Sequence, residues 1–234
     1  MTALLEVNDI HTFIGQFHIL QGVTVEVPEN SITVLLGRNG AGKTTTLRSI
    51  MGLNPPSRGT IWYAGRQIDG LRPYDIAQLG IGYVPDYRAI FKHLSVEENL
   101  KVAERRKGDL ERKKGFIFEI FPDLQRLYGW PGGQLSGGQQ QMLAVARALV
   151  PDNQLLLIDE PSEGLAPVII EQMMQAIRQL SSETTVLLVE QNFHVAHHLA
   201  DRYVIIEDGR SVHSGEMADL VGDRALITRY LSAA

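Results

Sequence analysis

The sequence contains no cysteine, no long apolar run and no excess of positive charge, and each absence excludes a class of protein. Without cysteine there is no disulfide framework, thiolate metal site or cysteine nucleophile, which suits a reducing compartment. The apolar runs LLLI and VLLV have strand length, well below the roughly 18 to 20 residues of a membrane span. The formal net charge of −5 disfavours a nucleic-acid-binding protein, so no nucleic-acid partner is expected.

The N-terminal segment MTALLEVNDI lacks the charged and apolar regions of a signal peptide. Together with the missing membrane span, this predicts that any membrane association depends on a partner protein. The 234 residues, of which 44% are hydrophobic, are enough to bury one sizeable core, as a single domain or as a domain with an insert.

What is present is an alternation of strands and helices. Strands are predicted at Leu4–Val7, Ile19–Val27, Ser31–Leu36, Ile61–Tyr63 and Ile81–Val84, with a helix over residues 43–51. Beyond residue 150, the apolar strands LLLID, TVLLV and YVIIE alternate with helices expected over 167–180 and 193–200. Asp208–Gly209 is a hairpin turn that leads to a last strand and a short helical segment. Continuously apolar strands separated by helices predict a parallel sheet buried on both faces.

The middle of the chain, from about residue 86 to 150, is predicted to be a helical insert. Ser95 and Glu98 form a capping box that opens one helix, residues 117–128 have a helical composition, and a further helix runs from Ser136 to about Val150. We interpret the charged run over residues 103–115 as a solvated helical surface rather than a lipid- or RNA-binding patch.

A phosphate-binding loop follows the strand ITVLL. The pattern G-x-x-x-x-G-K-[ST] stands between a predicted strand and a predicted helix, which is the context that the motif requires. Its glycines let backbone N–H groups approach a phosphate chain, Lys43 can reach the β- and γ-phosphates, and the Thr44 hydroxyl can ligate Mg²⁺. The loop therefore predicts a bound nucleotide with β- and γ-phosphates together with Mg²⁺, and the family resemblance given below implies that this nucleotide is ATP. The expected nucleotide-binding residues are Gly37, Arg38, Asn39, Gly40, Ala41, Gly42, Lys43, Thr44 and Thr45.

The strand LLLID ends in two carboxylates, Asp159 and Glu160. An acidic pair of this kind is by itself usually a solvated turn, but ligands of a parallel sheet bind beyond the carboxyl ends of its strands. With a phosphate-binding loop in the same sheet, we expect Asp159 to bind Mg²⁺ and Glu160 to polarise a water that attacks the γ-phosphate.

A second candidate anion site lies at the start of the helix that follows Leu135. Ser136 is the apparent N-cap of this helix, and Gly137, Gly138 and Gln139 form its first turn. A chain with one phosphate-binding loop does not need another phosphate site for its own nucleotide. We therefore expect this segment to serve a nucleotide held by a second subunit; the alternative is a capped helix with a flexible lead-in.

The phosphate-binding loop, the LSGGQ segment and the Asp-Glu strand, in this order and with a helical insert between the first two, resemble the ATPase domain of ABC proteins from about Leu4 to the end. The resemblance implies an α/β P-loop NTPase core with a mainly parallel sheet, an N-terminal antiparallel β subdomain and an inserted helical subdomain. The core would comprise residues 1–85 and 151–234, and the insert 86–150 would carry LSGGQ. In this family two domains dimerise head to tail around ATP, and residues 162–165 would contact the second domain.

Shorter peptides point to one branch of the family. DEPSEGLAP at 159–167 and VEQN at 189–192 resemble the ATPase subunits of branched-chain amino acid and urea importers, especially the smaller of the paired subunits. This implies an ATP-hydrolysing subunit, peripheral to the cytoplasmic face of the membrane. Its implied partners are a second ABC ATPase in a homo- or heterodimer, integral permease subunits and, indirectly, a periplasmic or extracellular substrate-binding protein.

Rival functions follow from the same motifs. Import of urea or a short amide is the alternative substrate class. A soluble ABC ATPase of DNA repair or translation is disfavoured because the chain has neither a long coiled-coil insert nor a second ATPase domain. A nucleotide-dependent regulator without turnover is disfavoured because Lys43, Asp159 and Glu160 are all present.

Three positions depart from the family pattern. Asp86 stands where the family usually has a Mg²⁺-sensing glutamine, which implies that a carboxylate makes this contact. Ile14 stands where an aromatic residue usually stacks on adenine, leaving Phe13 or Phe17 as possible substitutes. Gln191 stands where the family has the histidine that contacts the γ-phosphate. An amide can both donate to a phosphate oxygen and accept from water, so Gln191 is expected to take part in catalysis with Glu160 and Lys43.

The stretch LLVEQNFHVAHH contains three histidines close to Gln191. His194 and His198 are spaced i, i+4, as on one helical face of a zinc site. No cysteine or acidic residue nearby completes such a ligand set. We therefore interpret the stretch as a histidine-rich surface helix after a buried strand, and expect no zinc site tighter than an ordinary surface histidine pair.

Overall fold

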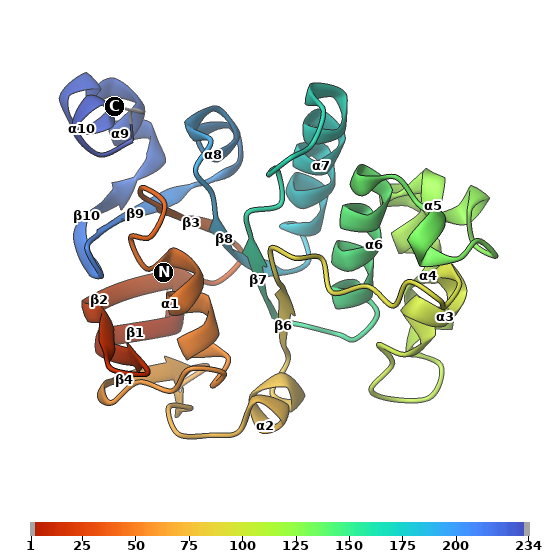
Figure 1. Ribbon diagram of the computed structural model, residues 1–234, viewed down its shortest axis with the longest axis horizontal. Helices are drawn as coiled ribbons and strands as arrows, with labels where there is room; N and C mark the ends of the chain where they lie inside the picture. The colour runs from red at the N-terminus through yellow and green to blue at the C-terminus, as the bar shows by residue number, and fades with distance from the viewer. Residues whose placement is uncertain (1–2, 232–234) are drawn as a thin grey trace.

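Two β-sheets form the framework of the protein, for which a computed structural model describes residues 3–231 (Figure 1). The first sheet is antiparallel, in the order β2–β1–β4–β5. The second has the order β10–β9–β3–β8–β7–β6 and is parallel except for its edge strand β10. The strands are β1 Ala3–Ile14, β2 Phe17–Pro28, β3 Ile32–Leu36, β4 Arg58–Tyr63, β5 Arg66–Gln67, β6 Ile81–Val84, β7 Leu155–Asp159, β8 Thr185–Val189, β9 Arg202–Glu207 and β10 Arg210–Glu216. The predicted α/β architecture, with an antiparallel N-terminal sheet beside a mainly parallel one, is confirmed.

The helices separate these strands along the chain. They are α1 Lys43–Ile50, α2 Pro73–Gln78, α3 Val96–Lys101, α4 Asp109–Ile120, α5 Pro122–Arg126, α6 Gly137–Leu149, α7 Pro167–Leu180, α8 Phe193–Leu199, α9 Met217–Gly222 and α10 Arg224–Tyr230, with a 3₁₀ turn at Gly132–Gln134. Among residues 3–231, none of these helices has the length and apolarity needed to cross a bilayer.

The parallel sheet is buried on both faces, as its continuously apolar strands predict. Along β3, Val34 and Leu36 belong to a core shared with α6, α7 and α8, whereas Leu35 belongs to a second core. This second core lies between the two sheets and includes Leu47 and Ile50 of α1 (Figure 1). Two packed faces hold β3 and α1 firmly, so the loop that joins them is presented on a rigid support.

The segment between β6 and β7 is helical, but its elements differ from the predicted ones. The capping box of Ser95 and Glu98 is present, yet the helix that it opens, α3, ends at Lys101. The expected helix over 117–128 is instead the end of α4 and the short α5, because Phe121-Pro122 interrupts it and a proline cannot continue the hydrogen-bond ladder. The division into a core and an insert at residues 86–150 remains a prediction.

The charged run 103–115 is only partly the solvated helical surface that the sequence suggested. No helix covers its first part, and α4 begins at Asp109. The Asp109 side chain is buried and accepts hydrogen bonds from the backbone N–H groups of Arg105 (2.9 Å) and Arg106 (2.7 Å). One carboxylate of the run thus stabilises the loop that enters α4, which charge patterning alone does not reveal.

Two hairpins can be compared with the strands and turns predicted from the sequence. β1 extends to Ile14, well beyond the expected Val7, and turns into β2 through Gly15 and Gln16. The predicted turn at Asp208–Gly209 is confirmed: both residues have positive φ, 47° and 74°, and join β9 to β10.

Candidate functional site

Three neighbouring strands of the parallel sheet end at the same edge and supply the site. β8 lies between β3 and β7, so the segments that follow Leu36, Asp159 and Val189 are adjacent. They enclose a cavity of about 480 Å³. Its lining consists of Ile14, Ile19, Asn39, Gly40, Gly42, Lys43, Thr44, Thr45, Asp86, Glu160, Glu163 and Gln191. The fold therefore brings the predicted phosphate-binding loop, Asp86, Glu160 and Gln191 together around one space.

The loop 37–42 has the backbone that its glycines allow. Gly37, Gly40 and Gly42 have φ values of 147°, 80° and 111°, in a region that side chains rarely tolerate. A Cβ at Gly37 would lie 2.2 Å from the carbonyl oxygen of Ile206, so glycine is also required there by close packing. The loop leads directly into α1, whose N-terminal N–H groups have no intrahelical partner and suit a phosphate.

Lys43 is the only positively charged residue among the described residues that line the cavity. Its side chain is 4% exposed, and its ammonium donates hydrogen bonds to the carbonyl oxygens of Gly37 (3.0 Å) and Arg38 (3.1 Å). Its Nζ also lies 3.5 Å from Glu160 Oε1. The ammonium is thus held beside the loop, within reach of a polyphosphate chain in the cavity.

The buried Asp159 and the half-buried Thr44 form a pair of oxygen ligands. The Thr44 hydroxyl donates to Asp159 Oδ1 at 3.1 Å, and the Tyr83 hydroxyl donates to Asp159 Oδ2 at 3.4 Å. Burial, together with the negative charges of Asp86 and Glu160, raises the pKa of Asp159 to about 6, although the hydrogen bond from Thr44 opposes the shift. A carboxylate whose charge is poorly solvated and crowded by other carboxylates gains from a cation, and hard oxygen ligands fit Mg²⁺. Thr44 and Asp159 therefore suit the expected metal.

Glu160 projects into the cavity from a strained backbone. Its φ of 46° is unusual for a residue other than glycine and costs on the order of 1–3 kcal/mol. The side-chain amide of Gln191 donates to Glu160 Oε1 at 2.6 Å, and Lys43 approaches the same oxygen. The structure thus joins the three residues expected to act in catalysis into one contact network, with Gln191 on the segment that follows β8.

Glu190 is a positioning residue that sequence reasoning missed. It is 1% exposed, and its carboxylate accepts hydrogen bonds from the backbone N–H groups of Ser162 (3.2 Å), Gln191 (3.2 Å) and Asn192 (3.3 Å). Burial raises its pKa, and the backbone donors compensate only in part. Glu190 thereby ties the loop after Glu160 to the loop that carries Gln191. The peptide VEQN shows a carboxylate directly after an apolar strand. The sequence does not show its contact with Ser162, which lies 28 residues away along the chain.

The acidic wall of the cavity includes Asp86 and Glu163. Asp86 is exposed, and its side chain accepts a hydrogen bond from the backbone of Tyr87 at 2.9 Å. The negative charge of Glu160 raises the pKa of the Glu163 carboxyl. With Glu160, these residues place three carboxylates against the single ammonium of Lys43, so the cavity favours a ligand that arrives with a cation.

The apolar side of the cavity is aliphatic. Ile14 and Ile19 line it, whereas Phe13 and Phe17, the expected aromatic substitutes, do not belong to its lining. Phe13 instead stacks on His18, with ring centroids 4.2 Å apart and planes 5° from parallel. Among the described residues that line the cavity, two isoleucines are the apolar side chains available to a nucleobase, and no aromatic ring is present.

The segment Leu135–Gln139 lies apart from this cavity, and none of its five residues is among the described lining. Ser136 caps α6 as expected: its hydroxyl accepts from the N–H of Gln139 (3.3 Å), whose side chain accepts from the N–H of Ser136 (3.0 Å). A Cβ at Gly138 would lie 2.7 Å from the Ile169 side chain, so this glycine permits α6 to pack against α7. The first turn of α6 therefore lies outside the chain's own cavity.

Comparisons with known proteins agree with this geometry. A sequence model of the family described as "ABC transporter" matches residues 20–163. The chain is 41% identical to the high-affinity branched-chain amino acid transport ATP-binding protein BraG of Pseudomonas aeruginosa, over 97% of this chain and 99% of that protein. It is 37% identical to the probable branched-chain amino acid transport ATP-binding protein LivF of Archaeoglobus fulgidus, over 88% and 89%. The ADP conformation of MJ1267, an ATP-binding cassette of an ABC transporter, has the same fold, with a TM-score of 0.86, 23% identity and coverage of 97% and 98%.

Proposed function

The chain belongs to the ABC transporter family as an ATP-binding subunit that hydrolyses ATP to drive transport, and on this premise we propose that it energises the uptake of branched-chain amino acids. The observation that carries this proposal is 41% identity to BraG over 97% of the chain. Substrate selection itself would rest with other subunits of the transporter. Urea or a short amide remains the second substrate class.

In the proposed site, the phosphate chain of ATP lies along the loop 37–42, with the N–H groups of the loop and the Lys43 ammonium as its partners. Thr44, Asp159 and Asp86 would hold Mg²⁺, which when bound neutralises phosphate charge. Glu160 would accept a proton from the attacking water, and Gln191 would orient Glu160 and the water. Ile14 and Ile19 would contact the adenine face.

We further propose that two such ATPase subunits, identical or different, close head to tail around ATP. The position of Leu135–Gln139 outside the chain's own cavity supports this arrangement, because a capped helix N-terminus with two glycines suits the phosphates of a partner's nucleotide. The dimer would dock on integral permease subunits at the cytoplasmic face of the membrane, and a substrate-binding protein would deliver the amino acid from the other side.

Reconstitution tests the proposed substrate class. We expect the subunit, assembled in proteoliposomes with its permease subunits and its partner ATPase, to hydrolyse ATP faster when its binding protein is loaded with leucine or valine. ATP-dependent uptake of labelled leucine should follow the same dependence. Stimulation by urea or short amides but not by leucine would contradict amino acid import while leaving the ATPase assignment intact.

Gln191 gives a sharper test of the catalytic arrangement. We expect Gln191→Ala to slow ATP hydrolysis by roughly tenfold or more, because Glu160 loses the amide that holds it at 2.6 Å. ATP affinity should change little, and Gln191→His should retain substantial activity because an imidazole N–H can make the same contact. The measurements are steady-state ATPase rates with the membrane partner and equilibrium ATP binding.

A matched control is Gln179→Ala. Gln179 also donates to a glutamate, Glu119, at 3.1 Å, but this exposed pair lies outside the described cavity lining. Its loss should leave turnover unchanged. Equal rates for Gln191→Ala and Gln179→Ala would remove Gln191 from the mechanism.

A further inference from the structure

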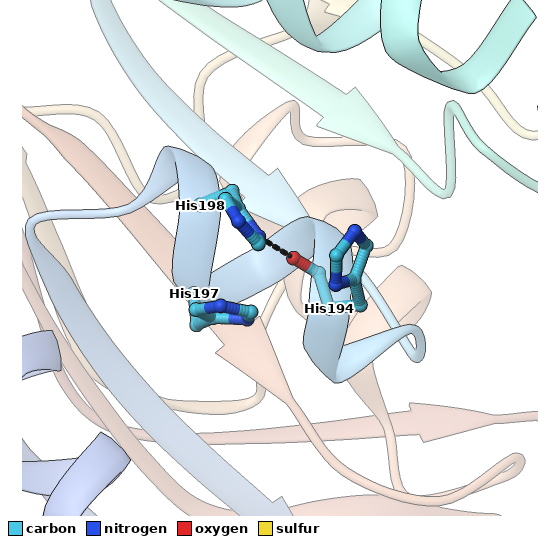
Figure 2. A group of neighbouring side chains, drawn as sticks. All are labelled: His194, His197 and His198. Atoms are coloured by element: carbon cyan, nitrogen blue, oxygen red, sulfur yellow. Dashed lines mark hydrogen bonds between the residues drawn. The ribbon is translucent and has the colours of Figure 1, made fainter. Parts of the chain in front are cut away.

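The three histidines of α8 form a cluster on the protein surface (Figure 2). One ring nitrogen from each of His194, His197 and His198 lies within 4.8 Å of those of the other two. The ring centroids of His194 and His198 are 4.3 Å apart, and those of His197 and His198 are 3.9 Å apart. His194 and His198 are exposed and His197 is half-buried, so an ion from solvent can reach the cluster.

The helix itself explains why the rings meet. Positions i, i+3 and i+4 lie on one helical face, which brings His197 and His198 over the turn that contains His194. The opposite face is anchored by the buried side chains of Val195, Ala196 and Leu199. The side chain of Asn192 caps the first turn by accepting from the N–H of His194 at 3.0 Å. Three imidazoles are thus carried by a packed and capped element.

Hydrogen bonds determine the tautomers of two of the rings. His197 Nδ1 lies 3.0 Å from the carbonyl oxygen of Phe193, and His198 Nδ1 lies 2.7 Å from that of His194. A carbonyl can only accept, so each Nδ1 carries the proton and each Nε2 keeps a free lone pair. Donation of the other ring N–H to a backbone carbonyl is the arrangement that orients histidine ligands at metal sites.

We propose that His194, His197 and His198 bind one divalent transition-metal ion, Zn²⁺ in the first instance, with water in the remaining position. Neutral imidazoles favour Zn²⁺ over Mg²⁺, and three protein ligands with an open position are a common zinc environment. This revises the sequence-based interpretation, which expected no zinc site tighter than an ordinary surface histidine pair. None of the three residues is among the described lining of the nucleotide cavity, so the ion would brace α8 rather than take part in hydrolysis.

Zn²⁺ titration of nucleotide-free protein without an affinity tag tests the site. We expect calorimetry to show one Zn²⁺ per chain. His197→Ala should weaken the affinity by about tenfold or more, because it leaves only the i, i+4 pair. The variant in which all three histidines are replaced by alanine should lose the 1:1 binding. The matched control replaces His11 and His18, whose rings touch at 3.2 Å between Nδ1 and Nε2, and it should bind Zn²⁺ as the parent does.

Two further readouts separate ligation from a folding defect. Zn²⁺ should raise the unfolding temperature of the parent but not of the triple variant, because a ligand that binds only the folded state stabilises it. Without zinc, the triple variant should hydrolyse ATP within a few-fold of the parent, which shows that it is folded. The proposal is overturned if the parent binds no stoichiometric Zn²⁺, if His197→Ala binds as tightly as the parent, or if the His11/His18 variant loses the site.

Discussion

Replacement of Lys43 by alanine is expected to lower ATP turnover by about a hundredfold or more and to weaken ATP binding. Among the described residues that line the cavity, Lys43 supplies the only positive charge, against the carboxylates of Asp86, Glu160 and Glu163. Without the ammonium, a polyphosphate would face an acidic wall with only uncharged hydrogen-bond donors and its own cation to stabilise it. Steady-state hydrolysis and equilibrium binding of a fluorescent ATP analogue measure the two effects.

The same substitution also removes contacts that exist before ATP binds. The carbonyls of Gly37 and Arg38 and the carboxylate of Glu160 each lose one partner, so the thermal unfolding of Lys43→Ala without nucleotide serves as the folding control. Lys43→Arg preserves the charge in a planar, bulkier group, and we expect it to recover ATP binding better than turnover. Unchanged turnover in Lys43→Ala would mean that hydrolysis takes place at a different site.

Which residues of the candidate site lie together was largely predictable, because short contiguous motifs encode them. The phosphate-binding loop needs a strand, glycines with unusual backbone angles and a helix in immediate succession, and all are visible in GRNGAGKT. Likewise, Asp159 and Glu160 follow an apolar strand directly. Once a parallel sheet is predicted, the common carboxyl edge brings these segments together without further information.

Contacts between distant segments could not be predicted in this way. Glu190 appeared only as part of a peptide resemblance, and its three backbone donors come from two separate loops. The aromatic residues of the first hairpin were plausible adenine contacts by sequence, yet Phe13 packs on His18 and leaves Ile14 at the cavity. Which side chain of a hairpin faces a ligand depends on strand register and bulges, and β1 contains several register shifts.

The errors in the helical segment arise because side-chain hydrogen bonds to the backbone compete with helix formation. The composition of residues 103–115 is compatible with a helix, but the buried side chain of Asp109, the first residue of α4, accepts hydrogen bonds from the N–H groups of Arg105 and Arg106 in the loop before it. The three histidines of α8 show what helical periodicity can and cannot predict. Helical periodicity places all three on one face, but whether a ring nitrogen of each approaches those of the other two depends on rotamers that only the structure reveals.

Replacement of Glu160 by glutamine is expected to lower turnover by about a hundredfold to ten-thousandfold while ATP still binds. Glu160 holds a positive φ of 46°, and its Oε1 contacts both the Gln191 amide and the Lys43 ammonium. Backbone strain of this kind persists where the surrounding structure requires one orientation of a side chain. A glutamine of the same size keeps the shape and a carbonyl acceptor, but it cannot take up the proton of an attacking water. Single-turnover assays with radiolabelled ATP separate the lost chemistry from retained binding.

The same variant tests the dimer, because a subunit that cannot hydrolyse ATP should remain closed around it. Light scattering of Glu160→Gln with ATP and Mg²⁺ is expected to show a dimer, either with itself or with its natural partner ATPase.

Gly137→Asp in the same background should prevent this dimer from forming, since a carboxylate in the first turn of α6 would repel the phosphates of the partner's nucleotide. Glu207→Gln, an exposed carboxylate at the end of β9 outside the described cavity lining, should hydrolyse ATP normally and form no stable dimer. A Glu160→Gln protein that remains monomeric with ATP, alone and with its partner, would refute the assignment of Leu135–Gln139 to a nucleotide held by a second subunit.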